Sequence, residues 1–233
     1  MKVAVFGDSF VEDVFQSYST WFSDFDEYGL GGSDMWYAYN QFLDHHEKYD
    51  KVIFACTSTR RVSMYDEEFG WFLFPNPESC KSKRNEHPSY EIMEKYLTHI
   101  SGMSGARDEL FCELLVNRIR HLRPDTLFIK CFPDSPGPDV TPLIAISKIE
   151  QGDIQVENFS DTGKPVDIRI AHLTEESHNI IKMEVEKALA LEEKWLDLDI
   201  SMFSNLEIDK QKYFVPIDSP LNHKRSRRNA RRS

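Results

Sequence analysis

Apolar runs of strand type alternate with helix-type segments along most of this 233-residue chain. This alternation predicts a parallel β-sheet covered by helices, because consecutive parallel strands need a crossover that is usually helical. The expected architecture is therefore a three-layer α/β/α sandwich. We expect strands at 2–6, 25–30, 51–56 and 126–132, and helices at about 11–22, 33–48, 89–100, 110–122 and from Thr174 onward.

The length of the chain suits one sizeable core with an insertion. The rhythm of strands and helices breaks after residue 60, where an aromatic, loop-like stretch at 69–75 precedes a polar stretch at 81–88. The aromatic residues of this insertion fill a satellite core or cap a substrate. The predicted organisation is one flavodoxin-like domain at 1–200 with an insertion at about 60–104, a C-terminal extension at 201–222, and a basic, disordered tail at 223–233.

The charge of the chain is unevenly distributed. The formal net charge is −11, yet the eleven residues at 223–233 contain six Lys and Arg residues and no acid. Removing these six positive charges from −11 leaves −17 on the rest of the chain. Such an acidic body repels polyanions, so nucleic acid is not expected to bind it. The tail could make weak contact with nucleic acid or with an acidic partner.

The sequence indicates a cytoplasmic protein. No apolar run approaches the length of a membrane span, and the first residues lack the layout of a signal peptide. The four cysteines are widely scattered, and Cys56 and Cys131 lie inside apolar runs of strand type. They are expected to be buried free thiols in a reducing compartment. The oligomeric state stays open.

Four short features lie where predicted strands end or where the last predicted helix begins. They are Ser9, Gly31-Gly32, Thr57–Arg60 and His172. Because the carboxyl ends of parallel strands meet at one edge of a sheet, these features are expected to converge there. A serine hydroxyl becomes a nucleophile when a histidine takes its proton, and a carboxylate can orient that histidine. A glycine-rich turn can present a backbone N–H to the oxyanion that forms.

These residues resemble the sequence blocks of the SGNH (GDSL) hydrolases, and of their divergent branch in bacteria and bacterial viruses. Gly7-Asp8-Ser9 is similar to the first block, whose serine is the nucleophile and donates its own N–H to the oxyanion hole. Residues 30–34 resemble the second block, with Gly32 as the oxyanion-hole glycine. Residues 172–178 resemble the last block, in which the catalytic histidine precedes a helix. The resemblance runs from residue 1 to about 191 and implies a serine ester hydrolase that uses no metal or cofactor.

Two positions depart from the family pattern. Thr59 stands where the family has an asparagine that donates to the oxyanion, so the Thr59 hydroxyl or the Arg60 guanidinium would replace the amide. Losing one such donor typically costs about 10²–10³ in rate. Arg169 stands where the family has the triad aspartate, and the nearest acid is Asp167. The implied site has Ser9, His172 and Asp167 as triad, Ser9, Gly32 and Thr59 as oxyanion donors, and Arg60 as an auxiliary residue.

Each of these residues also fits a purely structural role. Ser9 could cap the first helix, Gly31-Gly32 could form a tight turn, and His172 could cap the last helix or lie in a loop. Asp167 could be a solvated loop carboxylate. The pair His45-His46 suggests a metal site at first sight, but adjacent side chains on a helix diverge, so we expect both at the surface.

The leading functional hypothesis is hydrolysis of a small or carbohydrate-linked ester. The alternative is a catalytically weak or inactive module of the same fold that binds a partner or belongs to an assembly. A nucleotide-binding protein is disfavoured because no loop has a GxxxxGK[ST] or GxGxxG pattern.

Overall fold

The computed structural model describes residues 1–8, 11, 25–68, 70–74, 80–81, 83–99, 101–146, 166–167, 175–203 and 215–216. At its centre is a four-stranded sheet of order β2-β1-β3-β6 in which all neighbouring strands are parallel. The prediction of a parallel α/β sheet is confirmed. The strands are β1 (Val3–Gly7), β2 (Phe25–Gly29), β3 (Lys51–Cys56) and β6 (Leu127–Lys130).

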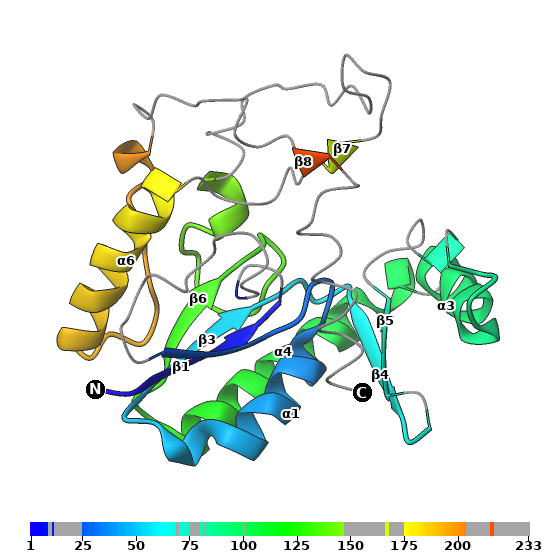
Figure 1. The fold of residues 1–233 in the computed structure, drawn as a ribbon, viewed down its shortest axis with the longest axis horizontal. Coiled ribbons are helices and arrows are strands. Elements are labelled where there is room, and N and C mark those ends of the chain that lie inside the picture. The colour runs from blue at the N-terminus through cyan, green and yellow to red at the C-terminus, as the bar shows by residue number, and fades with distance from the viewer. Residues whose placement is uncertain are drawn as a thin grey trace.

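Helices cover both faces of this sheet (Figure 1). The odd-numbered residues of β1 pack toward α6 (Glu175–Ala190). The even-numbered ones pack toward α1 (Met35–His45) and α4 (Ser101–Leu122). The strands read as continuous apolar runs because both of their faces are buried. This is the three-layer arrangement that the alternation along the sequence predicts.

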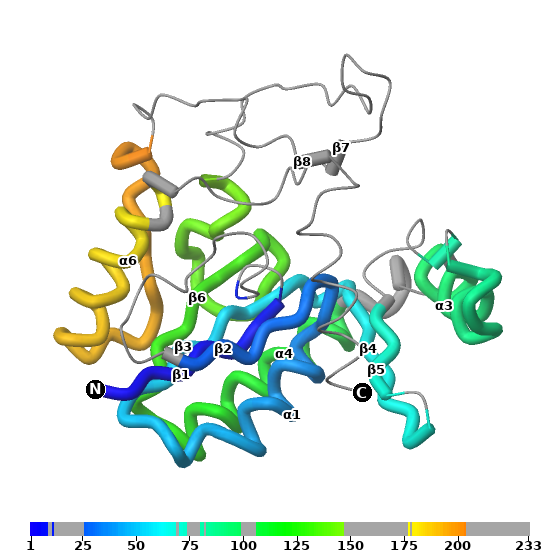
Figure 2. Tube along the Cα trace, viewed as in Figure 1, coloured from blue at the N-terminus to red at the C-terminus, as the bar shows by residue number. Residues whose placement is uncertain are grey.

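The strand order changes direction at β1. β2 lies on one side of β1, and the chain runs from β2 through α1 to β3 on the other side (Figure 2). In open parallel sheets, ligands bind outside the carboxyl ends of the strands at such a point. The carboxyl ends of β1 and β3 are therefore where a site is expected in this fold.

The insertion contains a β-hairpin that the sequence reading did not predict. Strands β4 (Val62–Asp66) and β5 (Gly70–Phe74) pair antiparallel, so most of the stretch at 69–75 is strand and not loop. Aromatic residues favour strands when they can pair across them, and Tyr65 lies opposite Trp71 here. Gly70, with a φ of 79°, supplies the left-handed conformation at the turn.

The satellite core predicted for the insertion is confirmed. Phe72 of β5 packs against a small buried cluster next to helix α3 (Pro88–His99), separate from the clusters on the sheet. The buried members of this cluster are Cys80, Tyr90, Met93 and Leu97.

All four cysteines are free and buried, as predicted. The surface position expected for His46 is wrong, because only 8% of this residue is exposed. After α1 the chain continues as the short 3₁₀ helix η2 (His46–Lys48). The His46 ring stacks on the Phe42 ring with 4.3 Å between centroids. None of the helices within the described residues is long and apolar enough to cross a membrane.

The described chain continues the main core past residue 200. Phe203, which follows the short helix η3 (Ile200–Met202), is 1% exposed and packs in the cluster under α6. Two short strands, β7 (Val166–Asp167) and β8 (Val215–Pro216), pair antiparallel. The tail at 223–233 lies outside the described residues, as does the helix expected at 11–22 apart from Val11.

Candidate functional site

The carboxyl ends of β1, β2 and β3 meet at one edge of the sheet. Gly7, the last residue of β1, lies opposite Gly29 of β2. The Ser33 hydroxyl, in the loop that follows β2, donates to the Gly7 carbonyl at 3.2 Å. Gly32 precedes Ser33 in the chain and has a φ of 84°, which a residue with a side chain rarely adopts. The structure thus brings the Gly7-Asp8 segment and the Gly32 turn together.

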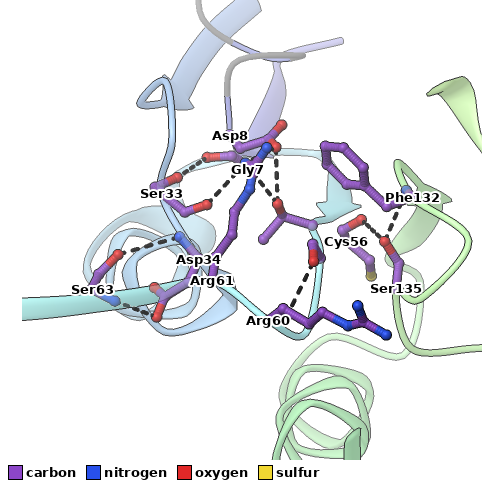
Figure 3. Close-up of polar contacts among 12 residues, drawn as sticks. Gly7, Asp8, Ser33, Asp34, Cys56, Arg60, Arg61, Ser63, Phe132 and Ser135 are labelled. Carbon is purple, nitrogen blue, oxygen red and sulfur yellow. Dashed lines mark hydrogen bonds and ion pairs between the residues drawn. The ribbon is translucent and has the colours of Figure 1, made fainter. Parts of the chain in front are cut away.

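An ion pair lies at the centre of this edge (Figure 3). Asp8 is completely buried, and its Oδ2 accepts from Arg61 Nη1 at 2.5 Å and from the Thr57 hydroxyl at 2.9 Å. The same Arg61 nitrogen donates to the Thr57 hydroxyl oxygen at 3.0 Å and to the Ser33 carbonyl at 3.2 Å. A buried carboxylate requires such partners, since its desolvation is otherwise uncompensated.

Arg61 is itself largely enclosed. Its side chain is 14% exposed, and its guanidinium lies over the Phe132 ring, 4.6 Å from the centroid. Phe132 belongs to the loop after β6, which is held to β3 because the Ser135 hydroxyl donates to the Cys56 carbonyl at 2.7 Å. Arg61 therefore contacts one residue after each of the four strands: Asp8 after β1, Ser33 after β2, Thr57 after β3 and Phe132 after β6.

A second buried carboxylate joins the hairpin to α1. Asp34 is the N-cap of α1 and accepts from the backbone N–H of Tyr37 at 2.9 Å. Its other oxygen accepts from the backbone N–H of Ser63 at 2.7 Å, and its own N–H donates to the Ser63 hydroxyl at 3.3 Å. Burial raises the pKa of Asp34, although these hydrogen bonds favour the charged form. The start of β4 is thereby attached beside the Gly32 turn.

Thr59 and Arg60 face a different acid, Asp134. The Ser58 and Thr59 hydroxyls donate to Asp134 Oδ2 at 2.7 and 3.4 Å, and Arg60 Nε lies 3.8 Å from the same oxygen. Thr59 is buried, whereas the Arg60 side chain is 80% exposed. To donate to an oxyanion, Thr59 would have to turn its hydroxyl away from Asp134. Arg61, rather than Arg60, is directed at the end of β1.

The predicted triad is only partly within the described residues. Ser9 and His172 lie outside them, and of Asp167 the backbone alone is described, paired with Val215. Their predicted roles stay predictions. Asp8 directly follows β1 and precedes Ser9 in the chain, so the described network reaches the residue next to the predicted nucleophile.

Sequence reasoning missed the role of Arg61 and the buried contacts of Asp8, Asp34 and Asp134. One signal was present: Asp8 follows a strand buried on both faces, and a carboxylate there needs a cation or several donors. The sequence offers two adjacent arginines, Arg60 and Arg61, after the neighbouring strand. Asp134 had no comparable signal, because its partners Ser58 and Thr59 come from a segment distant in the chain. Asp34 had the local signal of an N-cap before α1, but its bond to Ser63 had none.

Within the part of the chain that the structure describes, no group of three or more His, Cys, Asp or Glu residues is placed to hold a metal ion. Comparisons with protein-family models, with curated proteins and with solved structures found no match to this chain.

Proposed function

We propose that this protein is a serine ester hydrolase of the SGNH (GDSL) type with Ser9 as its nucleophile. The observation that supports this most strongly is the Ser33–Gly7 hydrogen bond, at 3.2 Å, between the Gly32 turn and the end of the strand that leads into Ser9. The first and second sequence blocks of the resemblance thus lie side by side. The strand order β2-β1-β3-β6 also agrees with the start of the flavodoxin-like order.

In the proposed reaction, Ser9 Oγ attacks the ester carbonyl carbon while His172 takes the hydroxyl proton. His172 then gives this proton to the leaving alcohol, and a water molecule hydrolyses the acyl-enzyme by the same steps in reverse. The backbone N–H groups of Ser9 and Gly32 and the Thr59 hydroxyl would stabilise the oxyanion, with Arg60 as an auxiliary donor. Asp167 would orient His172. No metal or cofactor enters the reaction written in this way.

The proposed substrate is a small or carbohydrate-linked acyl ester rather than a bulk lipid. The sequence has no amphipathic, membrane-seeking segment that would bring the site to a lipid surface. The acidic composition, with a net charge of −11, also disfavours binding to anionic membranes.

The proposal is tested by treating the protein with a fluorophosphonate probe and mapping the adduct by mass spectrometry. We expect the adduct on Ser9 and Ser9-dependent hydrolysis of p-nitrophenyl acetate. The Ser9→Ala variant is the blank, and His172→Ala should lower both rates by about 10²–10⁴ because it removes the general base. If Ser9 is not labelled and the unaltered protein hydrolyses the ester no faster than Ser9→Ala, the proposed ester-hydrolase function is refuted.

The second candidate is an inactive module of the same fold that binds a partner. The position of Thr59 favours it, because the hydroxyl at the family's asparagine position donates to Asp134 in this structure. The labelling experiment decides between the two candidates.

A further inference from the structure

We infer that Arg61 is a positioning residue for the nucleophile: it holds the Asp8 carboxylate and thereby fixes the turn that carries Ser9. The inference rests on the proposed function. It concerns a residue outside the sequence blocks through which the chain resembles the SGNH hydrolases.

A single nitrogen of Arg61 joins three parts of the site. Nη1 donates to Asp8 after β1, to Thr57 after β3, and to the Ser33 carbonyl beside the Gly32 turn, at 2.5, 3.0 and 3.2 Å. Because Thr57 also donates to Asp8, the side chains of Asp8, Thr57 and Arg61 form a closed ring of hydrogen bonds. Neither the carboxylate nor the guanidinium can rotate without losing several charge-assisted bonds in a buried site.

Asp8 is held at the end of β1 through both its side chain and its backbone. The Asp8 carbonyl accepts from the backbone N–H of Val11, three residues further along the chain, at 2.9 Å. The Asp8 carboxylate is fixed by Arg61 and Thr57. Releasing the carboxylate would let the Asp8 peptide rotate and displace the neighbouring serine. A displacement of about 1 Å at a reacting group can cost on the order of 10²-fold in rate.

The site requires an arginine and not merely a positive charge. The guanidinium is planar, stacks on the Phe132 ring with 4.6 Å to the centroid, and still directs a nitrogen to Asp8. A lysine would keep the charge but would lose the stacking and the fixed donor geometry. The neighbouring Arg60 cannot take over, since its side chain is 80% exposed and lies near Asp134.

The test compares Arg61→Ala and Arg61→Lys with Arg107→Ala, which removes an arginine of α4 whose side chain is 66% exposed and pairs with Asp108, outside the proposed site. Two quantities are measured on folded protein: the second-order rate of fluorophosphonate labelling at Ser9, and kcat and KM for p-nitrophenyl acetate. We expect Arg61→Ala to lower the labelling rate and kcat by about 10²-fold, with KM changed less than about threefold. Arg61→Lys should lose about tenfold and Arg107→Ala less than about twofold.

Chemical rescue separates positioning from a merely structural role. Millimolar guanidinium should restore part of the labelling rate in Arg61→Ala and should leave the rate of Arg107→Ala unchanged. If Arg61→Ala does not fold, Arg61→Lys carries the test, since it keeps the charge beside Asp8. Labelling of folded Arg61→Lys and Arg61→Ala at the rate of the unaltered protein would overturn the inference while leaving the proposed function intact. If the unaltered protein is not labelled at Ser9, the proposed function fails and this inference fails with it.

Discussion

Gly7 has no room for a side chain. A Cβ at this position would lie 2.7 Å from Val11 Cγ2 and 2.8 Å from Ala55 Cβ, well inside normal contact distances. Gly7 is not among the glycines with positive φ, so close packing, and not backbone conformation, is what requires glycine here. The missing side chain lets the end of β1 lie against β3, where Asp8 meets Thr57 and Arg61.

Replacing Gly7 by alanine should therefore damage both stability and the site. We expect Gly7→Ala to lower the free energy of unfolding by about 1–3 kcal/mol through overpacking. The rate of Ser9 labelling should fall with it, because the turn after β1 must move. Urea unfolding and fluorophosphonate labelling measure the two effects.

Gly70→Ala is the matched control for this substitution. Gly70 has a φ of 79° and no atom within 4 Å of its ideal Cβ position, so its cost is backbone strain of about 1–2 kcal/mol. It lies at the start of β5, at the turn of the hairpin. We expect an unchanged labelling rate in Gly70→Ala. Equal labelling rates in the two variants would contradict the packing argument.

At the scale of single residues, the sequence predicted where the strand ends meet better than it predicted which side chains face one another there. The ends of the first three strands were predicted to converge, and Gly7, Gly32 and the segment after β3 do so. Which of Arg60 and Arg61 points inward could not be predicted, because neighbouring side chains differ only in tertiary surroundings. His46 was misjudged for the same reason, since its burial comes from a short helix that periodicity does not reveal.

At the scale of elements, Asp34 joins two segments that sequence reasoning treated separately. Its carboxylate both caps α1 and accepts from the backbone N–H of Ser63 in β4. We expect Asp34→Ala to lower the free energy of unfolding by about 2–4 kcal/mol, because it leaves two buried backbone donors without an acceptor. Faster hydrogen exchange of the β4 amides should accompany this loss.

Ser63→Ala is the milder comparison for this junction. It removes only the hydroxyl that accepts from the Asp34 N–H at 3.3 Å, and keeps the Ser63 N–H that binds the carboxylate. We expect a cost of about 1 kcal/mol and β4 amides that stay protected. A loss in Ser63→Ala as large as that in Asp34→Ala would show that the carboxylate is not the anchor of the hairpin.

Elements that follow apolar periodicity were predicted best. β3 has the predicted bounds, Lys51–Cys56, because both of its faces are buried. Helix α4 was predicted from Leu110, yet it begins at Ser101, where no apolar pattern marks the start. Some residues that suggested α4 are also not buried: Leu110 and Leu114 are 56% and 57% exposed. The apolar pattern thus identified the helix without identifying its buried face.

At the scale of the whole molecule, burial in the core changes the pKa of three cysteine thiols. Cys56, the last residue of β3, packs on the α1 and α4 side of the sheet, whereas Cys131, which follows β6, packs on the α6 side. Burial raises the pKa of both thiols, and it raises the pKa of Cys112 on α4 to about 12. Each of these thiols therefore stays protonated in the folded protein at pH values where the unfolded chain has begun to lose the proton.

This difference makes the protein lose stability in alkaline solution, and Cys112 offers a direct test. The Cys112 pKa is raised from 9.0 to about 12, so its contribution to stability is complete below pH 9 and is lost as pH rises toward 12. Between those values the folded state binds more protons than the unfolded state. The difference in unfolding free energy between the unaltered protein and Cys112→Ala should therefore fall by about 1.4 kcal/mol per pH unit between pH 9.5 and 11.

Val116→Ala truncates a buried, non-titrating side chain one turn further along α4, so its difference in unfolding free energy from the unaltered protein should stay constant over the same range. Urea unfolding at several pH values measures both differences, and a flat profile for Cys112→Ala would show that this thiol is not protonated by burial.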